Sequence, residues 1–594
     1  MYGAVVNNIW SFGGPCGTNQ LFLNPFAHYN FAGGWSVGSS PEITTNWIAS
    51  CGKWTVPVGG GFGKAFRLGG QSIKLDLDAY YNAIRPKAGN ETWLLQVKLT
   101  SISGVGTGVS APRTAVLAIM TALPLLALTS ARAAEPLTFV GGQACAGCHT
   151  AEFDAWKGSH HALAMQQATE ATVLGDFTGA QFEHFGVTTT FFRDGDRFVV
   201  RTGGPDGALH DYPIAYAFGV YPLQQYLITM PGGRLQAFGI AWDSRPKEQS
   251  GQRWFHLYPD QKLKPGDPLH WTGRDQTWNY QCAGCHSTNL QKNYDLSANT
   301  YATTWTDVDV SCEACHGPGS RHVAWAKAHA EGGSNPSGTD DNRKGLTNWL
   351  KATDNGHWEM NPDTAIARRT EKLASTELET CAACHSRRKV IAKNSVTGEP
   401  YLDAYLPALL EPGLYHADGQ MDGEVYEYGS FLQSRMHAAG VTCSNCHDPH
   451  TAKLRAEGNA LCAQCHLPEK FDVAAHHHHR PASAGAQCAN CHMPTKNYMV
   501  VDARRDHSIR VPRPDLSISL GTANACTECH ADPSAQWAAE TVAGWYPKGR
   551  QTTPHFGTAL HAGRIGAGDA EEQLDRLILD RDQPAIARRA PCRC

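Results

Sequence analysis

Apolar and polar positions alternate through the first hundred residues in a way that predicts β-strands. The two classes swap strictly over residues 73–79, and the pattern returns over residues 95–99. A period of two places successive side chains on opposite faces of a strand. Residues 1–104 therefore predict an N-terminal antiparallel β fragment. Alternation of this kind suits either a membrane-embedded sheet or a small soluble one.

The next segment has the layout of a secretory signal peptide. Arg113 precedes an apolar run over residues 115–128, and Ala131-Arg132-Ala133 follows as a cleavage site. The run is too short for a spanning helix, and a buried helix is the alternative. Because signal peptides stand at N-termini, we expect residues 1–110 to be foreign to the mature protein. Residues 105–133 then form a linker and signal-peptide-like segment.

Strand and helix patterns recur later in the chain. Residues 188–192 and 198–200 are rich in β-branched and aromatic side chains and flank Asp194-Gly195-Asp196, which predicts a hairpin. This hairpin falls in a predicted β-rich insertion over about residues 180–260. Residues 537–546 and 571–588 show amphipathic helical spacing. We expect a helical, truncated repeat-like tail over residues 536–594.

Composition narrows the class of protein. A length of 594 residues predicts two or three units. A net charge of −4 and a pI near 6.7 give no case for nucleic acid. Twenty cysteines and 28 histidines are an excess that needs a chemical explanation.

Eight copies of Cys-x-x-Cys-His supply that explanation. This spacing is the attachment signature of c-type haem: two thiols form thioethers with the porphyrin and the histidine binds iron. The cysteines are Cys145, Cys148, Cys282, Cys285, Cys312, Cys315, Cys381, Cys384, Cys443, Cys446, Cys462, Cys465, Cys488, Cys491, Cys526 and Cys529. The proximal histidines are His149, His286, His316, His385, His447, His466, His492 and His530. Eight covalent haems c, each with its iron, are predicted.

Other cysteine chemistries fit less well. Sixteen of the twenty cysteines lie in the motifs, which leaves little for a disulfide framework. Zinc ribbons do not require a histidine after every second cysteine, and iron–sulfur proteins use other spacings. The fold class expected is a mainly α and irregular multihaem cytochrome c fold over residues 134–535. It carries the β-rich insertion between the first and second motifs.

The second axial ligand of each iron decides between electron transfer and catalysis. An iron bound by two histidines is saturated, whereas an iron with one histidine has an open face. Enough histidines remain for most irons to be bis-histidine, with His256 as a further candidate. The distal candidates are His161, His270, His322, His437, His450, His477, His479 and His507, of which His477 and His479 belong to the run of residues 476–479.

The chain resembles the multihaem cytochromes grouped with cytochrome c554 and the octahaem hydroxylamine-oxidoreductase-like proteins. The resemblance covers about residues 139–537. It is carried by ACAGCHTAEFDAWKGSHHALAM, SCEACHGPGSRH, YGSFLQSRMHAAGVTCSNCHDPH and NYMVVDARRDHSIRVPRPDLS. It looks closest to a secreted branch that often carries tetratricopeptide repeats. Residues 1–104 resemble the C-terminal strands of outer-membrane transporter-like barrels, through NNIWSFGG and WTVPVGGGFGK.

The resemblance implies a periplasmic or extracellular electron carrier of a Gram-negative-type envelope. Donor and acceptor proteins are its expected partners, with no nucleic acid and no transmembrane helix in the mature cytochrome, and the tail suggests self-association. The alternative is an oxidoreductase acting on hydroxylamine, nitrite or tetrathionate at one five-coordinate haem. Arg387 and Arg388 would then be candidates for a distal role, although pairing with haem propionates is the simpler one. The Cys-x-x-Cys-Lys motif of pentahaem nitrite reductases and their octahaem relatives is absent.

Overall fold

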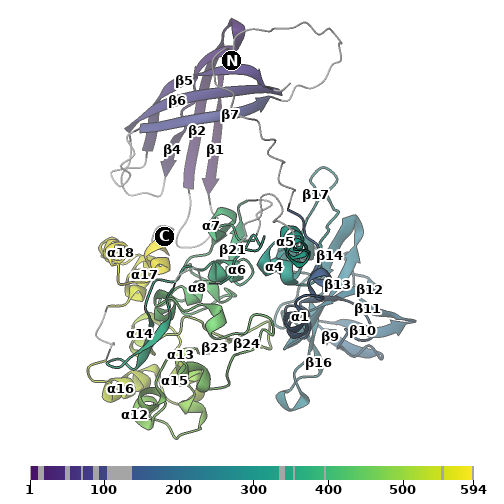
Figure 1. Ribbon diagram of the computed structural model, residues 1–594, viewed down its shortest axis with the longest axis vertical. Coiled ribbons are helices and arrows are strands. Elements are labelled where there is room, and N and C mark those ends of the chain that lie inside the picture. Colours follow the sequence, from purple (N-terminus) through teal and green to yellow (C-terminus); the bar gives the residue numbers. More distant parts are fainter. Residues whose placement is uncertain are drawn as a thin grey trace. The chain divides into compact units, whose positions relative to one another are not determined.

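The chain divides into two compact units in a computed structural model (Figure 1). Unit 1 is Met1–Ser130 with Arg593–Cys594, and unit 2 is Ala131–Cys592. The structure describes residues 2–10, 19–46, 54–68, 71–84, 93–102, 137–332, 342–351, 355–392, 397–549 and 554–590. The predicted signal-peptide-like segment and the last residues of the tail lie outside the described residues. No helix in the described ranges is both long and apolar enough to cross a bilayer.

Unit 1 contains one antiparallel sheet of seven strands. The predicted alternation is confirmed where β6 pairs with β7, with Leu75 opposite Leu99 and Leu77 opposite Val97. Val97 is 72% exposed, so one side of this pair keeps apolar side chains outside a core. The strands are β1 (Tyr2–Trp10), β2 (Asn19–Asn30), β3 (Trp35–Ser39), β4 (Ile43–Asn46), β5 (Trp54–Leu68), β6 (Gln71–Ile84) and β7 (Trp93–Ile102).

The described part of unit 2 has a nine-stranded antiparallel sheet after the first motif, larger than the predicted insertion. The predicted hairpin is confirmed by β10 and β11, where Asp194 pairs with Arg197 across a turn whose Gly195 has a φ of 59°. Its core is aromatic, and Phe191 stacks on Trp254 at 3.6 Å between ring centroids. The strands are β8 (Met165–Gln167), β9 (Ala180–His184), β10 (Val187–Asp194), β11 (Arg197–Gly203), β12 (Leu209–Phe218), β13 (Leu223–Met230), β14 (Arg234–Ala237), β15 (Ile240–Asp243) and β16 (Arg253–His256).

The rest of the haem-motif region uses short helices and two-stranded sheets. The helices are α1 (Thr150–Lys157), α2 (Trp278–Gln281), α3 (Ala283–His286), α4 (Cys312–His316), α5 (Ser320–Ala330), α6 (Glu377–Ala382), α7 (Tyr401–Ala404), α8 (Tyr428–Phe431), α9 (Arg435–Ala438), α10 (Ala460–Ala463), α11 (Pro468–Phe471), α12 (Ala474–His477), α13 (Cys488–His492), α14 (Pro514–Leu520) and α15 (Ala525–Cys529). The paired strands are β17 (Tyr294–Asp295) with β18 (Thr300–Tyr301), β19 (Trp358–Asn361) with β20 (Ile366–Arg369), β21 (Arg388–Val390) with β22 (Tyr405–Pro407) and β23 (Thr495–Tyr498) with β24 (Asp502–Arg505).

The expectation of a mainly α fold understates the β-structure. The insertion is a full sheet with its own hydrophobic core, and small hairpins lie between the later motifs. A long stretch without a haem motif must bury its own apolar side chains, and antiparallel pairing satisfies its backbone at the same time.

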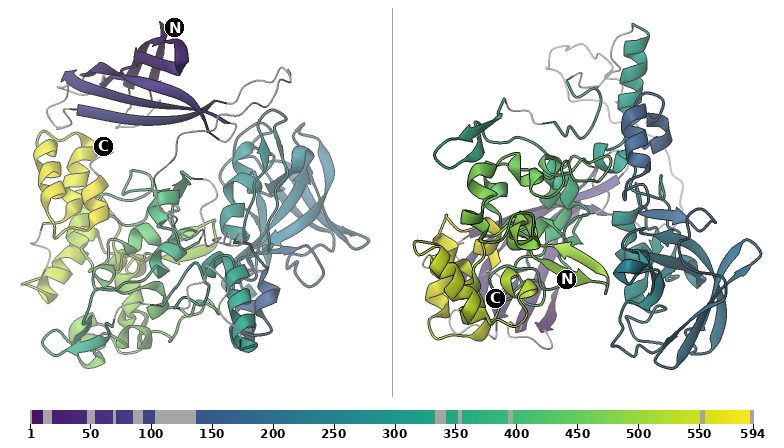
Figure 2. Two further views of the ribbon diagram at one scale, coloured as in Figure 1. Left: turned by 45° about the horizontal axis from the view of Figure 1, so that its top comes forward. Right: turned by 90° about the horizontal axis from the view of Figure 1, so that it is seen from below.

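Among the described residues, four α-helices follow the last motif. They are α16 (Ala535–Trp545), α17 (Phe556–Ile565), α18 (Ala570–Leu579) and α19 (Ala585–Arg589). Leu560 and Ile586 of this segment share a core with Leu410 and Tyr415, so the last three helices pack on the motif region. Within unit 2, the β9–β16 sheet and helices α17–α19 lie at opposite ends (Figure 2).

Candidate haem-binding site

One cavity of about 5550 Å³ runs through unit 2. Every cysteine and every histidine of the eight motifs lines it. An ordinary small-molecule pocket has about 300–1,000 Å³, so this space suits several large groups in contact. The sixteen motif cysteines are free thiols, as attachment to porphyrin requires. Cavity and ligand types therefore fit a chain of haems.

Each motif forms a tight helical turn. The histidine amide donates to the carbonyl of the first cysteine at 2.9–3.0 Å in the motifs of His149, His385, His447, His466 and His530. Residues i, i+3 and i+4 of a helix share one face, so both thiols and the imidazole point the same way. Asn524 caps one such turn by accepting from the Cys526 and Thr527 amides at 3.1 Å.

Six motif imidazoles face a second imidazole across the cavity. With metal–nitrogen bonds of about 2.0 Å on both sides of an iron, two ring centres lie about 6 Å apart. The observed centroid separations are 6.0–6.5 Å, which leaves room for one metal atom between the rings. The pairs are His149–His322, His385–His161, His316–His450, His447–His507, His492–His476 and His530–His479.

Five predicted distal candidates thus lie opposite a motif histidine. In the run of residues 476–479, the sequence did not single out His476, which lies opposite His492, whereas His477 accepts from the His479 amide at 3.1 Å. Consecutive histidines on one turn point in different directions, and only the packing of α12 selects among them.

The other candidates contact no motif imidazole in the part of the chain that the structure describes. His270 hydrogen-bonds Thr272 at 2.8 Å, and His256 stacks on His184 at 3.8 Å. His437 packs edge-on against Phe431. Their roles as ligands stay predictions.

The motif histidines His286 and His466 have different ring neighbours. Within the described residues, the ring contact of His286 is with Phe218, edge-on at 5.7 Å, and that of His466 is with Phe471, at 5.4 Å. These two motifs therefore differ from the six with paired imidazoles.

Backbone carbonyls orient several of the imidazoles. The Nδ1 atoms of His286, His492, His322 and His507 lie 2.7–3.0 Å from the carbonyls of Ala164, Arg510, Lys344 and Arg505. An Nδ1–H bound in this way leaves Nε2 as the metal-binding nitrogen and fixes the ring plane.

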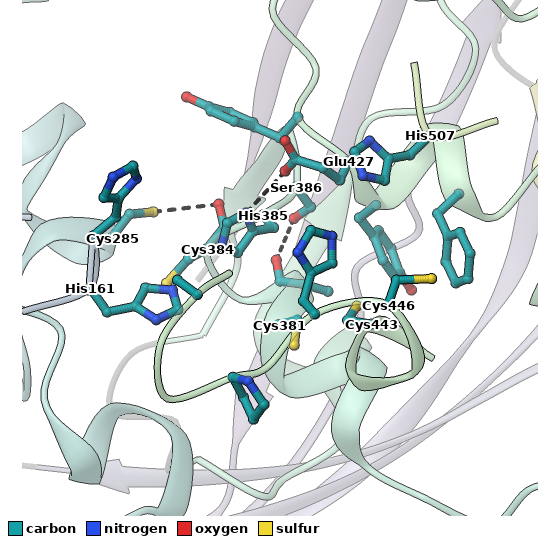
Figure 3. A pocket seen from close by; sticks show the side chains of 18 of the residues that line it. His161, Cys285, Cys381, Cys384, His385, Ser386, Glu427, Cys443, Cys446 and His507 are labelled. Atoms are coloured by element: carbon teal, nitrogen blue, oxygen red, sulfur yellow. Dashed lines mark hydrogen bonds and ion pairs between the residues drawn. The ribbon is translucent and has the colours of Figure 1, made fainter. Parts of the chain in front are cut away.

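One motif histidine has a carboxylate in that position. His385 Nδ1 donates to Glu427 Oε2 at 2.9 Å (Figure 3). Burial would raise the pKa of Glu427, but the hydrogen bond and charge of His385 outweigh it and lower the pKa to about 2. Burial acts to lower the pKa of His385, but the hydrogen bond and charge of Glu427 outweigh burial and raise the pKa of His385. Both groups line the cavity and form an ion pair there.

Cysteines of different motifs lie against one another. Cys285 Sγ donates to the Cys384 carbonyl at 3.8 Å. The thiols are hydrogen-bonded in three further pairs, Cys145–Cys312, Cys381–Cys443 and Cys462–Cys488. Cys315 and Cys384, Cys446 and Cys465, and Cys491 and Cys526 lie within electrostatic range of each other. Since each sulfur would attach to a porphyrin edge, adjacent sulfurs would bring two porphyrin edges together.

Two cations lie beside Cys285. Arg388 Nη2 donates to Cys285 Sγ at 3.8 Å, and its guanidinium lies 4.0 Å from the Tyr405 ring centroid. Lys292 Nζ donates to the Tyr280 carbonyl at 3.1 Å. Burial, followed by the charge of Arg388, lowers the pKa of Lys292. Neither cation has a carboxylate partner in the described ranges.

A zinc-type arrangement is not what the site shows. Over the described residues, no group of three or more His, Cys, Asp or Glu side chains is placed to hold a metal ion by itself. A structural zinc site needs four such ligands in a tetrahedron. Paired imidazoles separated by a gap, in a cavity also lined by the motif thiols, instead fit haem c.

These features define a multihaem c-type cytochrome. Residues 144–177 and 248–317 match the family of cytochrome c554 and c-prime, and residues 437–471 match the doubled CXXCH motif. The chain is therefore similar to the cytochrome c554 family in the segments that hold its first three motifs. No curated protein matches it significantly.

Two solved structures are similar to the chain. The outer cell wall cytochrome OcwA shares 19% identity at a TM-score of 0.45, with 76% of this chain and 95% of that chain covered. The octaheme sulfite reductase MccA of Wolinella succinogenes shares 17% identity at a TM-score of 0.28, with 63% of this chain and 58% of that chain covered.

Proposed function

We propose that the protein is an octahaem electron carrier in which most irons have two histidine ligands. The observation that carries this proposal is the set of six imidazole pairs with a gap of one metal atom. A six-coordinate iron has no open position for a substrate, so its chemistry is the gain and loss of one electron. The haems supply this redox chemistry, and the chain's residues set ligation, spacing and local charge.

The cysteine contacts suggest the order of the haems. Each haem is named by its motif number along the chain. The hydrogen-bonded thiols would join haems 1–3, 4–5 and 6–7, and the cysteines within electrostatic range support the links 3–4, 5–6 and 7–8, which gives the order 1–3–4–5–6–7–8. The second haem joins the fourth through Cys285 and Cys384. Electron tunnelling falls steeply with edge-to-edge distance, so neighbours in this order are the expected transfer partners. The fourth haem, held by His385, is then a branch point.

We place the carrier in the periplasm or outside the cell. The support is the signal-peptide layout of residues 113–133 and the covalent attachment motif itself. The N-terminal sequence of the purified protein tests this. A start at Ala134 supports export and processing, whereas a start at Met1 contradicts both the processing and the proposed separation of residues 1–110.

A second candidate function rests on His286. Its ring contact within the described residues is Phe218, and the cations of Arg388 and Lys292 lie close to its motif. An iron held by His286 alone would have an open face beside two positive charges, which suits a small nitrogen or sulfur oxyanion. Propionates of the haems compete for the same cations.

Low-temperature electron paramagnetic resonance of the oxidised protein, matured with haem c, distinguishes the two functions. A haem count of eight with every iron low-spin supports the pure carrier. One high-spin iron that shifts on addition of nitrite, hydroxylamine or sulfite supports the second function. A haem count well below eight, or mostly high-spin iron, contradicts the proposed ligation.

A further inference from the structure

Glu427 gives one axial histidine a chemical environment that the others lack. In the ranges that the structure describes, the motif histidines with a hydrogen-bonded Nδ1 are His286, His385 and His492. Two of them contact backbone carbonyls, which are neutral. Only His385 contacts a carboxylate, at 2.9 Å.

The backbone holds Glu427 in this place. The Tyr428 amide donates to the His385 carbonyl at 2.9 Å, and the Arg387 amide donates to the Val425 carbonyl at 3.2 Å. Two antiparallel contacts therefore fix the segment before α8 against the motif, although the two residues lie 42 positions apart. The carboxylate has little freedom to leave the imidazole.

The other charged side chains near Glu427 do not cancel the negative charge of its carboxylate. Among the described residues, its ion pair is with His385 alone. The nearby Arg504 pairs with Asp502 and Glu424 instead, at 2.6 and 2.8 Å. The imidazole of His385 therefore faces a carboxylate that no arginine or lysine neutralises directly.

Two physical effects follow for an iron bound by His385. A carboxylate that accepts from Nδ1–H makes the imidazole a more basic, more electron-rich ligand. Its negative charge also acts directly on the iron across a partly desolvated site. Ferric iron carries one more positive charge than ferrous iron, so both effects stabilise the ferric state and oppose reduction.

We propose that Glu427 is a positioning residue that lowers the reduction potential of the fourth haem, the branch point that joins the haems of His286, His316 and His447. This rests on the proposed electron-carrier function. With haems bound, an electron would then favour the neighbouring haems over the branch point. The haem of His447 receives a weaker effect, because Glu427 lies within electrostatic reach of His447 and His507 without bonding either ring. Figure 3 shows Glu427 between His385 and His507.

The test is spectroelectrochemical titration of the haem-loaded full chain with Glu427→Gln and Glu427→Asp. The glutamine removes the charge and keeps the shape, whereas the aspartate keeps the charge. We expect Glu427→Gln to change the ferrous-to-ferric ratio of one haem about tenfold at fixed potential, an upward shift of about 59 mV for one electron. A smaller shift in the same direction is expected in a second haem. Glu427→Asp restores most of the original curve.

Glu424→Gln is the matched control. It removes one negative charge from the same segment, but Glu424 pairs with Arg504 and bonds no motif imidazole. An equal shift in this variant, or a titration curve unchanged in Glu427→Gln, would overturn the inference. Haem content and low-spin resonance are measured on every variant. Missing haem or missing low-spin resonance in the unmutated protein contradicts the carrier function. Normal haem content and resonance, with a titration curve unchanged in Glu427→Gln, contradict only the role of Glu427. If only Glu427→Gln loses haem, the Asp variant decides: an unshifted potential supports the charge effect, and a shifted one refutes it.

Discussion

Removal of His322 provides a direct test of the imidazole pairs. His322 lies on α5, its ring centre is 6.0 Å from that of His149, and its Nδ1 is 2.8 Å from the Lys344 carbonyl. Alanine has a higher helix propensity than histidine, so His322→Ala should leave α5 intact. The change opens one face of one iron. About one eighth of the iron should therefore turn high-spin, given eight haems with one iron each.

The assay is the high-spin resonance together with the absorption spectrum, before and after addition of free imidazole. Imidazole should enter the vacated position and restore the low-spin signal, which a general loss of structure would not allow. His270→Ala is the matched control, because His270 bonds Thr272 and has no motif imidazole in ring contact. High-spin iron in the His270 variant with none in the His322 variant would refute the pairing.

Three further predictions concern stability. Phe191→Ala should lower the free energy of unfolding of the unit 2 sheet by about 3–5 kcal/mol in chemical denaturation, because this ring is 1% exposed and stacked on Trp254. An equal loss of stability in Val187→Ala, at an exposed position, would contradict this. Glu313→Gln should lower the free energy of unfolding by about 1–3 kcal/mol, because the buried carboxylate accepts from the Val140, Gly141 and Gly319 amides. It should also speed proteolysis near residue 140, and unchanged cleavage would refute this role of Glu313. Burial, followed by the charge of Asp307, raises the pKa of Asp309 to about 7. The contribution of Asp309 to folding stability is therefore full below about pH 4 and is lost as the pH rises through 7. Asp309→Asn should flatten stability between those pH values, and an unaltered pH profile would show that Asp309 does not titrate there.

Local patterns were read correctly where a short stretch contains all the information. The hairpin of β10 and β11 follows from alternating residues around a Gly-containing turn, and strand β6 follows from its period of two. The full size of the β9–β16 sheet did not follow, since pairings such as β13 with β15 depend on a core assembled from distant residues.

The distal histidines show the same limit of prediction from local sequence. His322 and His450 follow their motifs closely in the chain, and both lie opposite a motif imidazole, but of a different motif from the preceding one. His270 had an equally suggestive position and lies against Trp271 and Thr272. Spacing along the chain reports the presence of a ligand type, and the direction of its ring depends on tertiary packing.

The sequence by itself predicted the chemistry of this protein: eight Cys-x-x-Cys-His motifs predict the porphyrin anchors and one axial ligand each, because these atoms lie within five consecutive residues. Tertiary structure alone decided which imidazoles face each other, which motifs are neighbours and which histidine meets a carboxylate. His385 and Glu427 are 42 residues apart and meet only because two backbone hydrogen bonds join their segments. Covalent attachment is local, whereas the second ligand and the charge beside it come from whichever chain segment packs there.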